Sequence, residues 1–163
     1  MGERCPEGIL TISSEIQPQP ANEMNSWRLV RTPNPAGGRD AVAAMRTADG
    51  SRSDLDFAGL MLRCGDVEPE VLVVLVRPLP IYSHPNIAIE ADSSSVDLIA
   101  TVVPPGLLVL LPSEATALAK GPWRRIAEVK MTVAEKGISI SGVVLLAGLD
   151  AAMPQLEASC LAR

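Results

Sequence analysis

The sequence predicts a mainly β fold, an antiparallel β-sandwich or flattened barrel with two short helices. Short apolar runs of strand length recur along the chain, and most of them are joined by turn-forming residues that favour hairpins. There is neither a regular alternation of strands and helices nor a Gly-rich phosphate loop, so a nucleotide-binding Rossmann or P-loop fold is not expected. Residues 26–163 are predicted to form this single domain. Residues 1–25, which are rich in polar residues and proline, are predicted to be a flexible N-terminal arm.

Composition restricts the classes of partner. Of the 163 residues, 47% are apolar but only 2% are aromatic, so the core is expected to consist of Val, Ile, Leu, Ala and Met. The net charge is −5, and single-strand binders need aromatic platforms and a basic surface, so nucleic acid is not an expected partner. No apolar window has the length of a membrane span, so we expect no integral membrane segment.

The first half of the chain predicts two hairpins. Residues 27–31 alternate like a strand, residues 33–38 form a Pro-Gly turn, and residues 41–47 supply the return strand. Residues 58–64 and 70–77 then form a second, largely buried hairpin. This central hairpin is the strongest structural signal in the sequence.

The second half predicts further strands and both helices. Prolines around residues 77–85 favour an edge segment or a crossover. Residues 87–90 and 96–102 are predicted to form a hairpin, residues 107–111 a strand, and the residues after Ser113, its N-cap, a helix that ends at Lys120. Strands at 125–133 and 138–146, joined through Gly137, and a closing helix at 148–160 complete the prediction. Pro154 is expected to lie in the first turn of the closing helix, because proline is tolerated there.

No catalytic residue, metal ligand or cofactor is predicted. The polar stretch 49–56 suggests a calcium loop, but it lacks the acid spacing and the closing Glu of an EF-hand, and we interpret it as a solvated loop. His84 is the only histidine, and its proline-rich surroundings favour a structural role. A small hydrolase that uses a pair of loop carboxylates is an alternative, since loops that flank one hairpin can converge. The candidate acids are Asp49, Asp54, Asp56, Asp66 and Glu68.

Three cysteines leave at least one thiol unpaired within a monomer. Cys64 ends a central strand, and Cys160 lies on the apolar face of the closing helix with Met153 and Leu156. The two can form a disulfide that pins the helix to the central hairpin, or can be two ordinary buried thiols. Cys5 would be the spare thiol.

Several motifs resemble the periplasmic accessory proteins of type VI secretion, often labelled TagO or VasI. They are Trp27 at the start of the domain, Leu62-Arg63-Cys64, and Gly148-Leu149-Asp150-Ala151-Ala152 followed by Leu156 and Cys160. The resemblance implies an exported protein in which Cys64 and Cys160 are bridged. Residues 103–112 also resemble the central segment of the invasion-associated locus B proteins, which are exported β domains with disulfides.

The expected function is therefore that of a non-catalytic exported β domain. It would serve as a binding or structural accessory of an envelope or secretion-related assembly, with a protein partner in the cell envelope. The expected location is periplasmic or secreted, as a mature form whose leader has been removed. The N-terminus has no signal-peptide core, so a cytoplasmic chain is the alternative. An apolar-ligand carrier is a further alternative, because a β barrel lined with Val, Leu and Met can hold a lipid.

Overall fold

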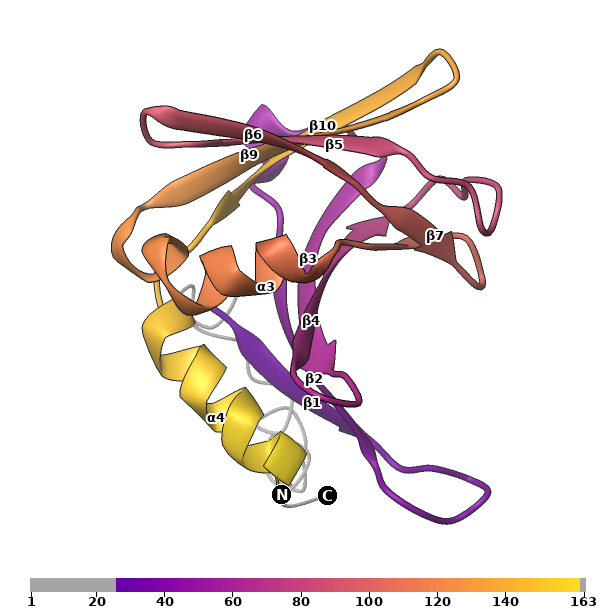
Figure 1. Ribbon diagram of the computed structural model, residues 1–163, viewed down its shortest axis with the longest axis vertical. Helices are drawn as coiled ribbons and strands as arrows, with labels where there is room; N and C mark the ends of the chain where they lie inside the picture. The colour runs from indigo at the N-terminus through magenta and orange to yellow at the C-terminus, as the bar shows by residue number, and fades with distance from the viewer. Residues whose placement is uncertain (1–25, 162–163) are drawn as a thin grey trace, which may run out of the picture.

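The structure, a computed structural model, describes residues 26–161 and consists of two antiparallel sheets with helices at one side (Figure 1). The predicted arm at residues 1–25, with Cys5, lies outside the described residues. The first sheet has six strands in the order β1 (Arg28–Thr32), β2 (Ala41–Thr47), β3 (Phe57–Cys64), β4 (Pro69–Leu75), β8 (Leu108–Leu110) and β7 (Thr101–Val103). The second has four strands in the order β10 (Ile138–Leu145), β9 (Glu128–Glu135), β5 (Asn86–Ala91) and β6 (Ser94–Ile99).

Within the described residues, four helical segments complete the fold. They are the α-helices α3 (Ser113–Lys120) and α4 (Leu149–Leu161) and the 3-10 helices η1 (Gly50–Arg52) and η2 (Pro122–Arg125). The mainly β class and the antiparallel sandwich with short helices are confirmed, and the described strands do not close into a barrel. No helix among residues 26–161 has the length and apolar character needed to cross a bilayer.

The core lies between the two sheets. Alternate residues of each strand face it, for example Leu60 and Leu62 of β3 and Val129 and Met131 of β9, all at most 1% exposed. At one point the ring of Phe57 in β3 packs directly on Gly142 of β10, so closely that a Cβ atom at Gly142 would overlap that ring. The core is mainly aliphatic, as expected.

The predicted hairpins are present, with one large correction. We expected a continuous strand over residues 96–102, but the chain breaks at Ala100, so β6 belongs to the four-stranded sheet and β7 to the six-stranded sheet. The Ala100 N–H donates to the carbonyl of Pro85 at 2.9 Å, which replaces a strand bond at the break. This short connection carries the chain from one layer of the sandwich to the other.

Two smaller corrections concern helix starts. We predicted that a strand begins at residue 125. In the structure this residue is the last one of η2, which begins at Pro122, and the strand β9 begins at Glu128. Ser113 is the first residue of α3 and not its cap, because Pro112 precedes the helix in an extended conformation. Prolines at or just before the first helical turn lose no helical hydrogen bond, and this explains both starts.

The closing helix α4 packs against β2 and β3 through Leu149, Ala152, Met153 and Leu156. Pro154 is its sixth residue, so the expectation that this proline lies in the first turn was wrong. Proline cannot donate to the carbonyl four residues earlier, that of Asp150. The Arg124 guanidinium donates to this carbonyl instead, at 3.4 Å, so an element next to the helix supplies a hydrogen bond that the helix lacks.

Candidate functional site

A two-sheet sandwich has four outer strands, and each leaves a row of backbone N–H and C=O groups without strand partners. At β10 this row is covered by the chain itself, through residues 49–54. The Asp49 N–H donates to the Val143 carbonyl at 2.8 Å, and the Val143 N–H donates to Ser53 Oγ at 2.9 Å. The Asp54 N–H and carboxylate bond the carbonyl and N–H of Ser141, both at 2.8 Å. This edge cannot accept another strand.

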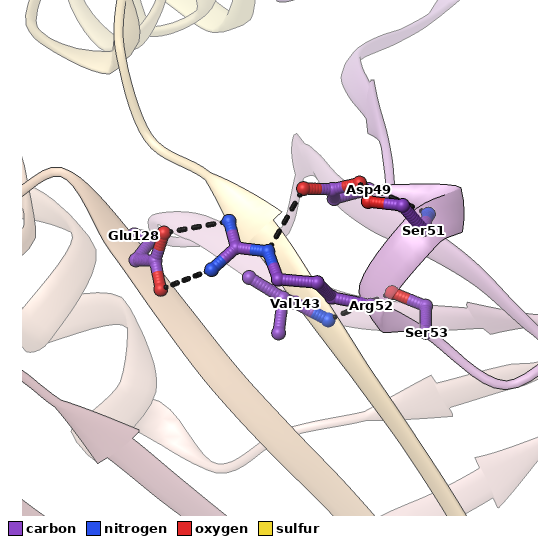
Figure 2. A network of polar contacts seen from close by, with 6 residues as sticks. All are labelled: Asp49, Ser51, Arg52, Ser53, Glu128 and Val143. Carbon is purple, nitrogen blue, oxygen red and sulfur yellow. Dashed lines mark hydrogen bonds and ion pairs between the residues drawn. The ribbon is translucent and has the colours of Figure 1, made fainter.

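Figure 2 shows how the covering loop is fixed in place. The Arg52 guanidinium donates to both carboxylate oxygens of Glu128, at 2.7 and 2.9 Å, and its Nε donates to Asp49 at 3.0 Å. The pKa of Asp49 is lowered by hydrogen bonds from Ser51, the larger cause, and from Arg52. The pKa of Arg52 is raised by its hydrogen bonds to Glu128, the larger cause, and to Asp49. The network is exposed, and its role is to hold η1 against β9 and β10.

The β7 edge is also covered. The Tyr82 N–H donates to the Val102 carbonyl at 2.7 Å, and the Val102 N–H donates to the Ser83 carbonyl at 3.0 Å. The proline-rich segment therefore acts as the predicted edge segment. At β1 the outer strand carries exposed Arg28 and Arg31, and charged side chains discourage strand addition.

The β6 edge differs from these three, because no described segment covers it and its six residues carry one charged side chain, Asp97, where β1 carries two in five residues. Its pairing with β5 closes across the two-residue turn Asp92-Ser93, which leaves the N–H and C=O groups of Ser95, Asp97 and Ile99 pointing outward. Within residues 26–161 no backbone or side-chain group bonds to these outward groups. Most of β6 is exposed, and Ile99 is 62% exposed. This edge is open to a strand from another molecule.

An apolar groove of about 450 Å³ lies directly beside this edge, between the β5–β6 hairpin and the α3–η2 segment. Figure 1 shows α3 lying below the four-stranded sheet. The groove has an apolar wall from each side and a polar rim at the hairpin end. The first wall is Ile89, Ala91, Val96 and Leu98, the second is Leu118, Pro122, Trp123 and Ile126, and the rim is Asp92, Ser93, Ser94, Ser95 and Glu114. We refer to this site as the β6 groove.

The charged side chains that line the β6 groove are both acidic, and the basic side chain of Lys130 lies on the outer face of the sheet, opposite Glu90. Asp92 and Glu114 lie on its rim, and Asp97 lies on the outer face of β6 beside Ala88 of β5. None of these three carboxylates has an ion-pair partner among the described residues, whereas Asp49, Glu68, Glu70 and Glu128 do. The groove thus combines free main-chain bonding groups, an apolar cavity and unpaired negative charge.

The five candidate acids do not converge. Asp49 and Asp54 serve the loop that covers β10, and the Asp56 carbonyl accepts the Val76 N–H at 2.8 Å. Asp66 and Glu68 follow β3, at its opposite end, where Glu68 lies 3.8 Å from Lys120. An eight-residue strand separates the two groups by about 25 Å, so no acid-base pair can combine one acid from each group.

Other side chains considered from sequence have local roles. His84 Nδ1 lies 3.3 Å from both the Ala100 carbonyl and Thr101 Oγ1, next to the break between β6 and β7. Within residues 26–161 no group of three or more His, Cys, Asp or Glu side chains is arranged to hold a metal ion. Cys64 and Cys160 form a disulfide with their Cα atoms 5.5 Å apart, joining β3 to the last turn of α4.

Sequence reasoning identified the residues of the β6 groove as strand and helix residues but not as a site. The one available signal was the alternation of Val96 and Leu98 with polar neighbours beside a serine-rich turn. That pattern does not show which strand lies at an edge. In comparisons with known proteins, no family model, no curated protein and no solved structure matches the chain significantly.

Proposed function

We propose that this protein is a non-catalytic binding module that works outside the cytoplasm, in the periplasm or as a secreted protein. It would act as an accessory of an envelope or secretion-related assembly. The observation that carries the proposal is the open β6 edge beside an apolar groove, in a fold that covers two of its other sheet edges with its own chain. An uncovered edge is an aggregation hazard for a monomer, so its retention favours a binding role.

The disulfide supports the proposed compartment. Such bonds persist in oxidising compartments and are rare in the cytosol. Here the bond crosses 96 positions of sequence and ties the closing helix to a central strand, so it is part of the fold's framework. The resemblance to the type VI secretion accessory proteins agrees with this compartment and with a partner in the envelope.

A second candidate function, the carriage of an apolar ligand, is favoured by the same cavity. A volume of about 450 Å³ lies in the range of small-molecule pockets, and its walls are apolar. Native mass spectrometry of protein from its host tests this candidate. A co-purified lipid that is lost from a Leu118→Lys variant would support the carrier. If the open β6 edge instead binds a strand of a partner protein, no such ligand is expected.

The proposal is tested by isolating cross-linked complexes from intact cells of the native host. The expected result is that the protein fractionates outside the cytoplasm with Cys64 and Cys160 bridged, and that a defined envelope protein is recovered in cross-linked form. Recovery of the protein in the cytoplasm with free thiols would contradict the compartment. Recovery outside the cytoplasm without any cross-linked envelope protein would contradict the accessory role.

A further inference from the structure

The β6 groove specifies the chemistry of its occupant more narrowly than binding in general. We propose that it takes an extended peptide segment in which apolar and basic residues alternate, added as a fifth strand to the four-stranded sheet. This inference rests on the proposed binding function and identifies the site and the class of ligand. It follows from three features of the groove, namely the direction of its main-chain groups, the faces of β6 and the sign of the nearby charge.

The main-chain groups provide the attachment. Ser95, Asp97 and Ile99 each point an N–H and a C=O away from β5, at the two-residue spacing of a strand. A peptide in extended conformation can pair with all three residues. Every strand pair between residues 26 and 161 is antiparallel, and antiparallel pairing is slightly more stable per residue, so we assign the added strand an antiparallel direction.

The two faces of β6 set the side-chain pattern of the peptide. Val96 and Leu98 face inward, and Val96 lines the groove, so inward side chains of an added strand would lie over Leu118 and Trp123. These positions favour Val, Leu or Ile. Trp123 is 2% exposed and forms a fixed part of the wall, whereas Leu118 is half-buried and can adjust to the guest.

The outward side chains of the added strand would meet negative charge. Asp97 lies on the outer face of β6, next to the added strand. Glu90 of β5 lies on the same face, opposite Ser95, and has Lys130 of β9 on its other side, so Asp97 is the main outer-face charge that the added strand would meet. The rim acids Asp92 and Glu114 flank the groove entrance. A basic residue at the positions between the apolar ones faces Asp97 on the outer face and Asp92 at the hairpin turn, while an acidic residue there is repelled; Glu114, on α3, lies on the groove side and adds negative charge there. The same charges discourage pairing of β6 with a second copy of this acidic chain.

The test uses a synthetic peptide of about ten residues that alternates Val and Lys, titrated into isotopically labelled full-length protein. We expect saturable binding with amide shifts concentrated at residues 94–99 and at the side chains of Leu118 and Trp123. A Val-Glu peptide should bind at least about tenfold more weakly, because its charges repel the carboxylates. A peptide of the same composition with its Val and Lys residues in separate blocks should also bind weakly, because it cannot place apolar and basic groups on opposite faces.

Protein variants separate the contributions of the main chain, the charge and the groove wall to peptide binding. Asp97→Pro removes one outward N–H that bonds nothing in the protein, and it should weaken peptide binding about tenfold with the fold intact. Asp97→Asn keeps the main chain and should weaken binding less, with a smaller salt dependence. Leu118→Lys should weaken binding through the groove. Ala117→Lys, on the exposed face of the same helix, is the matched control and should have no effect.

Peptides methylated at alternate backbone nitrogens give a test that needs no protein variant. One methylation register blocks the amides that face β6 and should abolish binding, and the other leaves them free and should preserve it. Equal binding of both registers, equal binding of the Val-Glu peptide, or shifts confined to another surface would overturn the proposal. Binding of a fatty acid in the groove without peptide binding would overturn it in favour of the carrier.

Cross-linking in cells by Asp97→Pro and by the unmodified chain shows whether the peptide-binding site or the accessory role itself is wrong. We expect the unmodified chain to cross-link an envelope protein and Asp97→Pro to lose that adduct. If Asp97→Pro still cross-links the same envelope protein in cells as the unmodified chain does, the accessory role stands and the β6 site is wrong. If neither form cross-links an envelope protein, the accessory role is wrong as well.

Discussion

Removal of the Cys64–Cys160 disulfide is the perturbation whose magnitude follows most directly from the structure. The bond closes a loop of 96 positions. In the chain-entropy model a loop of this length stabilises the folded state by about 4 to 5 kcal/mol, because the linked unfolded chain has fewer conformations. For a domain of this size that corresponds to a fall in Tm of about 15 °C. Such a loss is a large part of the stability of an ordinary domain.

The assay is urea denaturation of a Cys64→Ala/Cys160→Ala variant beside the oxidised protein. Both proteins carry Cys5→Ser, so that thiol exchange does not complicate the comparison. We expect a lower midpoint and a larger m value, because the unlinked unfolded chain exposes more surface. In hydrogen exchange, the last turns of α4 should lose protection first, since the bond attaches that end to β3. A loss below about 1 kcal/mol with unchanged α4 protection would refute the reasoning.

Three further predictions concern packing, a helix and pH. Gly142→Ala should destabilise the fold by about 1 to 3 kcal/mol in denaturant titration, because the new methyl group overlaps the Phe57 ring between the sheets. Pro154→Ala should stabilise the fold by about 1 kcal/mol and raise Tm, because an exposed proline inside α4 is replaced by a residue that donates a helical bond. Hydrogen bonds in the fold lower the pKa of Asp49, so its contribution is fully present above its ordinary value of 3.8 and disappears as the pH falls through the lowered pKa. Asp49→Asn should remove this part of the acid dependence in stability measured from about pH 5 to pH 2.

Each of these predictions has a control. Gly50→Ala places a methyl group in open space and should change stability by less than about 0.5 kcal/mol, and an equal effect at Gly50 and Gly142 would contradict the packing argument. Gln155→Ala is the exposed control in α4, and a gain there equal to that of Pro154→Ala would show that the backbone bond is unimportant. Identical acid profiles for Asp49→Asn and the unmodified protein would exclude a role for that carboxylate.

The sequence predicted the hairpins because their signals are local. Alternating apolar residues and turn residues such as Gly137 act over a few positions, and Gly137 adopts the expected positive φ of 83°. The strand break at Ala100 could not be predicted this way. Residues 96–102 are mostly apolar and contain neither glycine nor proline, and the change of sheet depends on a hydrogen bond to Pro85, a partner outside this segment.

The position of Pro154 shows a similar limit. Helix propensity places proline in the first turn of a helix. In the structure α4 begins at Leu149, so Pro154 is its sixth residue and lies beyond the first turn. Arg124, thirty positions earlier in the chain, bonds the carbonyl that the proline leaves free. A tertiary contact therefore overrides the local preference, and only the folded structure shows which residue provides it.

The candidate site was the least predictable part. The loop acids attracted attention because they are close together in sequence, yet β3 places Asp56 and Asp66 at opposite ends of a strand. The β6 groove combines residues from two hairpin strands and a helix pair, and its importance depends on which sheet edges are covered. Edge coverage is a property of the assembled sheets, so no spacing in the sequence records it.

The most direct test of the account is site-specific photo-crosslinking in the native host, with a photoreactive residue at Ser95 on the open β6 edge. Matched positions are Ser51 on the loop that covers β10 and Ala117 on the exposed face of α3. The account predicts an adduct with an envelope protein from position 95, formed outside the cytoplasm, and none from the two control positions. Adducts that form equally from all three positions, or from a control position alone, would contradict the assignment of the β6 edge as the binding site.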